Sequence, residues 1–382
     1  MCSSACPPIS SSRPRRRPPR RRRPTWSSSS ASTRRSPRPD PAPCGAVFRS
    51  VRHDGVVRVL AAPDKFRGTA TAAEVATAIA GAARAAGHIG IEMPLADGGE
   101  GTLAALGGPN RSSLVTGPLG DPVDASWRLS GSDAVIEMAL ASGLALLGGA
   151  AGNDPIAAST FGTGELISLA AESGARRIVV GVGGSATTDG GFGALRAMYP
   201  LQRFRGVEII VACDVRTRFV DAATVFAPQK GATSSQVELL RRRLVRLAQA
   251  YFDEYGIDVT EIARSGAAGG LAGALATLGA RLVDGFELVA DEVGFDEQLE
   301  HVDLVVTGEG FLDAQSFEGK VVGGVAASAT AAGVPVLVVA GDVFDGAEAG
   351  LDVVSLVERF GAERAFADPL GAIHDVVYER LR

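Results

Sequence analysis

Residues 181–191, GVGGSATTDGG, combine five glycines with three hydroxyl side chains and one carboxylate. They directly follow the β-branched run RRIVV, which we interpret as a buried strand. Each glycine in regular structure costs roughly 0.5–1 kcal/mol relative to alanine. A loop this rich in glycine is typical of a backbone that approaches a ligand closely, often an anion such as phosphate.

Acidic side chains follow several other apolar runs. They are Asp64, Asp97 with Glu100, Asp189, Asp214, Glu309 with Asp313, and Asp342. Each one, taken singly, is explained as well by a helix cap or a turn. Six such loops on one edge of a sheet instead indicate a site, because open α/β sheets bind ligands at the carboxyl ends of their strands.

Carboxylates, backbone amides, hydroxyls and a few cations together are what phosphoryl transfer from a magnesium nucleotide requires. The chain has 35 arginines but only three lysines, Lys65, Lys230 and Lys320, and all three lie beside glycine-bearing turns. Lysine is a compact point charge and binds phosphate as such. Contacts to phosphate or carboxylate would explain this placement, and so would chance.

Other catalytic motifs fit poorly. Gly181, Gly183 and Ala186 match the loose Gly-x-Gly-x-x-Ala pattern of dinucleotide-binding folds, but the next acidic residue at a strand end, Asp214, comes about 28 residues later instead of about 20. The chain has no Walker loop and no Gly-x-Ser-x-Gly elbow. Its four histidines are scattered, and Cys213 is the one cysteine beyond residue 44, which excludes a disulfide framework and suits the cytoplasm.

Apolar strands alternate with helical segments along residues 57–382, which predicts a parallel α/β sheet. Residues 112–148 have a β-rich pattern, and residues 160–174 are expected to form a helix that leads into the strand before the glycine-rich loop. No apolar run reaches the 18 or so residues that a membrane span needs.

Residues 1–55 differ sharply from the remainder. They hold thirteen arginines against Asp40 and Asp54, a net charge of +11, and the whole chain carries −5, which leaves −16 for the remainder. With almost no aliphatic residues, this segment is expected to be a disordered tail, or residues translated from upstream of the true start. Nucleic-acid binding and organelle targeting are the alternatives for the tail.

In their order along the chain, the motifs of residues 57–382 resemble those of the bacterial glycerate kinase family. They are APDKFRGTATAAEVATAIAGA, PLADGGEGT, VIEMALASGL, GTGELI, GVGGSATTDGG, ACDV, FAPQKGAT, GAAGGLAGAL and LVVTGEGFLDAQSFEGKVVGGVA. The resemblance implies transfer of the γ-phosphate of ATP to D-glycerate with Mg²⁺, the 2-phosphate being favoured over the 3-phosphate as product. It also implies a flavodoxin-like domain from both chain ends (56–95 and 296–382) and an inserted α/β domain (96–295). Five parallel strands are expected in the first of these domains, in the runs VVRVLAAPD, IGIEMPL, VDLVVTG, VPVLVVAG and LDVVSL.

Carried over by position, the resemblance implies a set of site residues. Asp189 and Asp313 are expected to be base and metal ligand in an order that stays open, with Asp214 as a further metal ligand. Arg67, Lys230 and Lys320 are expected on phosphate or on the glycerate carboxylate. Amides of Gly183, Gly184 and Ser185 are expected on phosphate, and the remaining substrate or nucleotide contacts are Asp64, Lys65, Asp97, Glu100, Gln229 and Glu309.

The chain departs from the family pattern at four places. The first loop has Lys65 and Arg67 where Ser-Phe-Lys-Gly is usual, and Phe311 stands where arginine is expected. Residues 217–219 replace Asn-Pro-Leu, and the segment between residues 193 and 207 is short. These departures motivate the alternative of a homologue that binds a nucleotide or small hydroxy acid without efficient turnover. Either Lys65 compensates for Phe311, or Phe311 packs under the first loop and Lys65 points to solvent.

Deleting residues 1–55 should leave the melting temperature and the activity of the protein unchanged, because the segment lacks the apolar pattern that a packed element needs. The two forms can be compared by thermal unfolding at equal concentration. A loss of several degrees in the truncated form would mean that the tail packs on the rest of the protein.

Overall fold

The computed structural model describes residues 55–66, 68–317, 320–344 and 350–382. The described residues, from residue 55 on, form one compact unit. Residues 1–54 of the predicted tail and Arg67 lie outside the described residues. None of the described helices is both long enough and apolar enough to cross a membrane.

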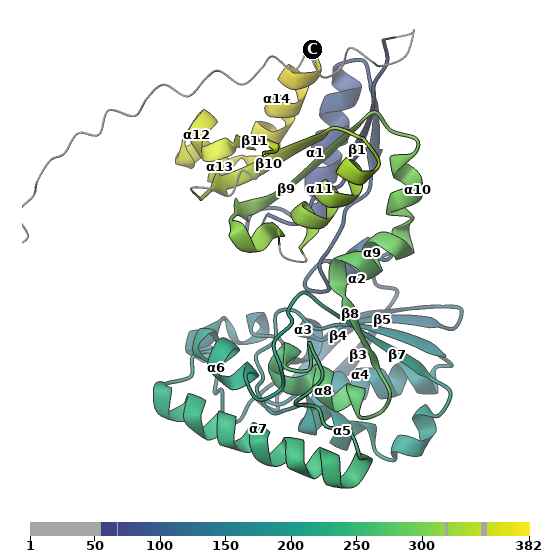
Figure 1. The fold of residues 1–382 in the computed structure, drawn as a ribbon, viewed down its shortest axis with the longest axis vertical. Helices are drawn as coiled ribbons and strands as arrows, with labels where there is room; N and C mark the ends of the chain where they lie inside the picture. Colours follow the sequence, from purple (N-terminus) through teal and green to yellow (C-terminus); the bar gives the residue numbers. More distant parts are fainter. Residues whose placement is uncertain (1–54, 67, 318–319, 345–349) are drawn as a thin grey trace, which may run out of the picture. The chain divides into compact units, whose positions relative to one another are not determined.

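The first sheet has five parallel strands in the order β11-β10-β9-β1-β2 (Figure 1). The strands are β1 (Arg58–Ala61), β2 (Ile89–Glu92), β9 (Leu304–Leu312), β10 (Val336–Val343) and β11 (Asp352–Ser355). Renumbered within this sheet, the order is 2-1-3-4-5, that of flavodoxin-like folds. The predicted fold class and its five strands are confirmed.

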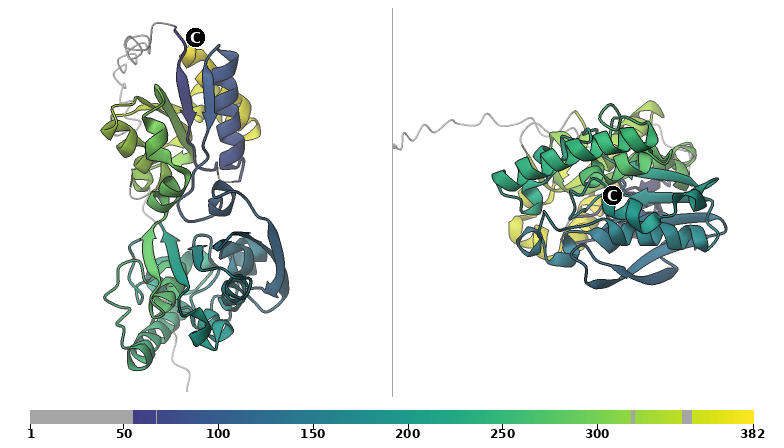
Figure 2. Two further views of the ribbon diagram at one scale, coloured as in Figure 1. Left: turned by 90° about the vertical axis from the view of Figure 1, so that its right-hand side faces the viewer. Right: turned by 90° about the horizontal axis from the view of Figure 1, so that it is seen from below.

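Helices cover both faces of this sheet, because its strands are apolar on both sides. Helix α1 (Ala72–Ala85) packs beside α14 (Pro369–Leu381) on one face, although they come from opposite ends of the described chain (Figure 2). Helices α10 (Phe295–Leu299) and α11 (Val321–Ala331) contribute to the core on the other face. The short helices α12 (Leu356–Phe360) and α13 (Ala362–Ala367) lie between β11 and α14 in the chain.

The second sheet has six strands in chain order, β3-β4-β5-β6-β7-β8. Its first three strands pair antiparallel and the rest pair parallel. The connections within the antiparallel part span only a few residues, too short for a crossover, so the expected parallel sheet is mixed here. The strands are β3 (Arg111–Thr116), β4 (Pro122–Ser130), β5 (Asp133–Glu137), β6 (Arg177–Gly181), β7 (Glu208–Cys213) and β8 (Arg281–Asp284).

Side chains alternate between the two faces of the parallel strands. Ile178 and Val180 of β6 face one core, and Val179 faces another. The first core includes α4 (Phe161–Glu172), α5 (Phe192–Met198) and α8 (Leu271–Ala276); the second includes α2 (Thr102–Ala105) and α9 (Gly285–Val293). The remaining helices are α3 (Ala139–Ser142), α6 (Ala222–Phe226) and α7 (Ser234–Tyr255).

Helix α9 packs on both sheets. Phe286, Val289 and Ala290 join the core of the first sheet, together with Leu60 of β1, and Leu288 packs on the second sheet. The predicted domain borders at 95/96 and 295/296 stay a prediction, and α9 belongs to neither sheet alone.

The acidic loops follow strands of both sheets, not one edge of a single sheet as the sequence suggested. Asp64 and Asp97 follow β1 and β2 of the first sheet, and Asp189 and Asp214 follow β6 and β7 of the second. Glu309 lies within β9. A shared site therefore requires that loops from the two sheets meet.

Gly285, the first residue of α9, should be intolerant of a side chain. A Cβ atom there would lie 1.9 Å from the carbonyl oxygen of Asp97, so one backbone must move. Gly285→Ala should lower the free energy of unfolding by about 1–3 kcal/mol. The control is Gly81→Ala within α1, where a Cβ meets no atom within 4 Å and should stabilise by roughly 0.5–1 kcal/mol. Equal stability of both variants in urea unfolding would contradict this packing.

Candidate active site

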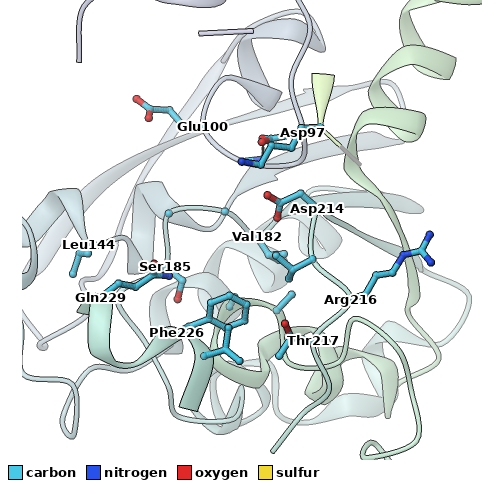
Figure 3. Close-up of a pocket in the computed structure, with 18 of the residues that line it drawn as sticks. Asp97, Glu100, Leu144, Val182, Ser185, Asp214, Arg216, Thr217, Phe226 and Gln229 are labelled. Carbon is cyan, nitrogen blue, oxygen red and sulfur yellow. Dashed lines mark hydrogen bonds between the residues drawn. The ribbon is translucent and has the colours of Figure 1, made fainter. Parts of the chain in front are cut away.

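Loops from both sheets line one cavity of about 1180 Å³ (Figure 3). It brings together most of the residues that the sequence predicted for a site. From that prediction it contains Lys65, Asp97, Glu100, Gly183, Gly184, Ser185, Asp214, Gln229, Lys230 and Lys320. Asp64, Asp189, Glu309 and Asp313 are not among its lining residues.

The glycine-rich loop after β6 has two amides available for an anion. The N–H of Gly183 is used within the protein, since it donates to the carbonyl of Gly98 at 3.2 Å. The amides of Gly184 and Ser185 donate to none of the described residues. Gly184 has φ +71°, which favours glycine. The prediction of three phosphate-binding amides is thus reduced to two by this geometry.

Lys230 lies under the glycine-rich loop and is buried, with 4% of its surface exposed. Its Nζ donates to the carbonyl of Thr187 at 2.6 Å and to Ser185 Oγ at 3.4 Å. Burial lowers the pKa of Lys230 to about 7, against an opposing effect of Asp189. None of the described carboxylates pairs directly with Lys230, and a buried ammonium in this setting favours binding of an anion nearby.

Asp97 and Lys65 form the polar wall of the cavity on the side of the first sheet. Lys65 Nζ lies 3.4 Å from Asp64 Oδ1 and 3.9 Å from Asp97 Oδ1. Burial raises the pKa of Asp64 to about 6; Lys65 counteracts this rise and Asp97 adds to it. Asp97 is 5% exposed, and its Oδ1 also accepts the N–H of Gly99. Lys65 is therefore held between two carboxylates.

Asp214 and Asp284 line the cavity on the side of the second sheet. Asp284 caps α9, and its Oδ2 pairs with Arg264 Nη2 at 2.9 Å. Arg264 Nη1 also donates to the carbonyl of Cys213 at 2.7 Å, directly before Asp214. Figure 3 shows Asp97 and Asp214 between Ser185 and Arg216, whereas the exposed Glu100 points away from them.

Asp189 has a different environment from the one expected. Its Oδ2 accepts the N–H of Thr160 at 2.8 Å, the hydroxyl of Thr160 at 2.9 Å and the N–H of Gly193 at 3.2 Å, and its Oδ1 accepts the N–H of Gly191. A carboxylate with this many donors holds backbone in place. The geometry therefore argues against the expectation that Asp189 is a base or metal ligand, and it favours a positioning role.

Glu309 and Asp313 are partly buried and are not among the residues that line the cavity. Burial raises the pKa of Glu309 to about 7, with smaller opposing effects of Ser316 and Lys320, and its Oε1 is buried without a hydrogen-bond partner among the described residues. Asp313 caps a local turn by accepting the N–H of Ser316 at 3.1 Å. Neither carboxylate lines the cavity, so the expected catalytic role of Asp313 has no support in this geometry.

Phe311 does not lie under the first loop. Its ring contacts Phe344 and Phe366, with centroid distances of 6.3 and 6.4 Å, and it is 44% exposed. Lys65 does not point to solvent either, because it pairs with Asp64 and Asp97. The suggested compensation of Phe311 by Lys65 is not supported, since Lys65 already balances two carboxylates.

Several cavity residues escaped the sequence analysis. Asp284 ends the run RLVD and precedes a glycine, the same pattern as the acidic loops that were recognised, so it could have been found. Arg216 lies two residues after Asp214 in a loop that was noted only for its departure. The apolar wall had no sequence signal of its own; it contains Leu144, Val182, Val215, Val225, Phe226, Ala267 and Ala268.

The carboxylate oxygens of Asp97 and Asp214 are ligands of the kind that a magnesium ion prefers. Mg²⁺ is usually held by one or two carboxylates, with waters and substrate phosphates completing its coordination. No group of three or more His, Cys, Asp or Glu side chains arranged for a metal occurs within the part of the chain that the structure describes. Two carboxylates on one cavity fit an ion shared with a nucleotide, but not a site built of protein ligands alone.

The fold and the cavity define an α/β protein of the phosphotransferase class, with backbone amides, cations and carboxylates at the carboxyl ends of parallel strands. The glycerate kinase family model matches residues 59–199 and 200–369. The chain belongs to the glycerate kinase family.

Individual relatives agree with this membership. The chain is 40% identical over 346 residues to a glycerate kinase of Halalkalibacterium halodurans, covering 79% of this chain and 91% of the relative. It is 37% identical over 351 residues to the glycerate 2-kinase of Escherichia coli K12, covering 81% and 90%. A crystal structure assigned to glycerate kinase 2 of Salmonella typhimurium LT2 superposes with a TM-score of 0.70 at 34% identity, covering 85% and 97%.

The Glu309 carboxyl should make stability depend on pH. Its pKa is about 7 in the folded protein and near 4.5 in an unfolded chain, so the folded state binds more protons between these values. The stability that protonated Glu309 provides is complete below pH 4.5 and is lost as the pH rises through 7.

Glu309→Gln should therefore gain stability relative to the wild type as the pH rises, on the order of 2 kcal/mol at pH 8 and little at pH 4. Urea unfolding across this range measures the difference. Glu300→Gln removes the same charge from an exposed position and controls for the loss of a charge. A pH-independent difference for Glu309→Gln would contradict the prediction.

Proposed function

We propose that this protein transfers the γ-phosphate of ATP to D-glycerate. Membership of the glycerate kinase family supports this activity, and the observation that carries it is the convergence of amides, cations and carboxylates on one cavity. The reaction needs these groups to position two substrates and to balance the charge of the transferred phosphoryl group.

The nucleotide fits the side of the cavity formed by the second sheet. Phe226 and Val182 offer apolar surface to a base, and the amides of Gly184 and Ser185 can donate to phosphate oxygens. Lys230 beneath them adds positive charge, and a bound phosphate would favour its protonated form. The glycine-rich loop is thereby prepared for an anion before the nucleotide arrives.

The acceptor hydroxyl fits beside Asp97 and Asp214. We assign Asp214 to a magnesium ion, as the sequence predicted, and Asp97 to the acceptor hydroxyl, since Glu100 points away. Magnesium, when bound, neutralises negative charge on the phosphate oxygens. Lys65 Nζ lies 3.9 Å from Asp97 Oδ1, and we assign to this carboxylate the role of accepting the hydroxyl proton as the phosphoryl group is transferred.

We propose 2-phosphoglycerate as the product, which the name of the Escherichia coli relative supports. A homologue without turnover is the less favoured alternative, because the four departures leave the lining carboxylates and lysines in place. We also propose a cytoplasmic location; the buried free thiol of Cys213 is compatible with a reducing compartment.

Incubation of the protein with ATP, MgCl₂ and D-glycerate tests the activity directly. Phosphorus NMR should show ADP and a phosphate monoester at the 2-position, which differs in its coupling to carbon-bound protons from the 3-phosphate. The 3-phosphate would overturn the proposed regiochemistry alone. ATP binding without any phosphoglycerate would overturn the proposed activity.

Asp97→Asn and Asp214→Asn should each lower turnover by about 100-fold or more while leaving the fold intact, because each removes a charge that acts at the reacting groups. Asp189→Asn should instead lower the free energy of unfolding by about 1–3 kcal/mol, since its backbone donors lose an acceptor. Asp253→Asn, an exposed substitution, is the control. A loss of turnover in Asp189→Asn without loss of stability would restore it as a reacting group.

A further inference from the structure

Four described residues lining the cavity are cationic, and three of them are already engaged. Lys65 is held between Asp64 and Asp97, Lys230 is buried under the glycine-rich loop, and Lys320 acts on the carboxylate of Glu309. Arg216 differs from them. Its side chain is exposed and makes no hydrogen bond or ion pair with any described residue. Its five donors are therefore available to a ligand.

Hydrogen bonds from residues 264 and 266 fix the backbone at Arg216. Its carbonyl accepts the N–H of Arg264 at 3.4 Å, and the carbonyl of Thr217 accepts the N–H of Gly266 at 3.0 Å. Arg264 also holds the carbonyl of Cys213, at the end of β7. The backbone of the loop after β7 is thus held in place before a ligand binds. Less conformational entropy of this loop is therefore lost when Arg216 binds a ligand.

Arg216 lies across the cavity from the glycine-rich loop, where we propose that the nucleotide phosphates bind. In Figure 3, Ser185 and Gln229 lie on one side, the Arg216 side chain extends on the other, and Asp97 and Asp214 lie between them. We place the nucleotide so that its phosphates extend from the glycine-rich loop to Asp97 and Asp214. The part of the cavity beside Arg216 then remains available for the acceptor.

The acceptor itself is an anion. Its carboxylate is repelled by Asp97, Asp214 and Asp284, so it must be bound at a distance from them by a cation. A guanidinium group matches a carboxylate through two parallel hydrogen bonds, which a lysine cannot provide. Phe311, where the family pattern has arginine, does not line the cavity.

We propose that Arg216 binds the carboxylate of the hydroxy-acid substrate and thereby selects acids over neutral polyols and amides. This inference rests on the proposed kinase function and adds the residue that determines its acceptor specificity. The loop of residues 214–219, in which the chain departs from its family, then supplies the planar cation for the acceptor.

Arg216→Gln tests the proposal, with Arg218→Gln as the matched control. Arg218 lies two residues further on the same loop, is exposed, pairs only loosely with Glu261 at 3.6 Å and does not line the cavity. Arg216→Gln should raise KM for D-glycerate at least about tenfold, as expected for loss of a charge-assisted contact. KM for ATP should change less than about twofold in both variants, and Arg218→Gln should match the wild type for both substrates.

Discrimination between D-glycerate and D-glyceramide gives a second readout. The ratio of kcat/KM for D-glycerate to kcat/KM for D-glyceramide should fall at least about tenfold in Arg216→Gln. The neutral amide gains no charge-assisted contact from Arg216 and therefore loses little when it is replaced. Arg216→Lys should recover part of the ratio through its charge alone.

Each result separates this inference from the activity on which it rests. Unchanged glycerate kinetics in Arg216→Gln would overturn the role of Arg216 while the kinase function stands. A rise in KM for ATP alone would overturn it in favour of a nucleotide contact. A wild type that phosphorylates no glycerate would overturn the proposed function itself.

Discussion

Direct contact between backbones, which only glycine permits, sets the geometry of the cavity. A Cβ atom on Gly183 would lie 2.4 Å from the Cα of Gly99, and one on Gly98 would lie 2.7 Å from the backbone of Ala212. The loop after β2 is thus inserted against the ends of β6 and β7, two strands of the other sheet. Asp97 reaches the same cavity as Asp214 because no side chains separate these backbones.

This arrangement removes charged groups from water, which costs free energy. Lys230, Asp64 and Glu309 all have pKa values moved toward the neutral form, and burial is the largest cause in each case. Such groups reduce the stability of the folded chain and cluster where charge is needed for function. Lys230 lines the cavity, while Asp64 and Glu309 lie next to its lining residues Lys65 and Lys320. Stability is therefore reduced in and directly around the cavity.

The sequence predicted the elements better than the roles of individual residues. Strand periodicity and family motifs identified all five strands of the first sheet and ten of the residues that line the cavity. The motif fixes the position of Asp189 but not the direction of its side chain, and Thr160, which donates to its Oδ2 at the N-terminus of α4, lies about thirty residues away. Arg216 was passed over because its significance depends on what the other cations contact, and that is a property of three-dimensional structure.

Helix α9 has a consequence for how the chain folds. Phe286 and Val289 complete the core of the first sheet, while Asp284, which caps the same helix, lines the cavity and pairs with Arg264 of the second. Neither sheet can bury its apolar face fully without a helix that the other also holds. Loss of either core exposes part of its partner, so the two sheets are thermodynamically coupled and should unfold in one cooperative step, although the second sheet is formed by a segment inserted between β2 and β9 of the first.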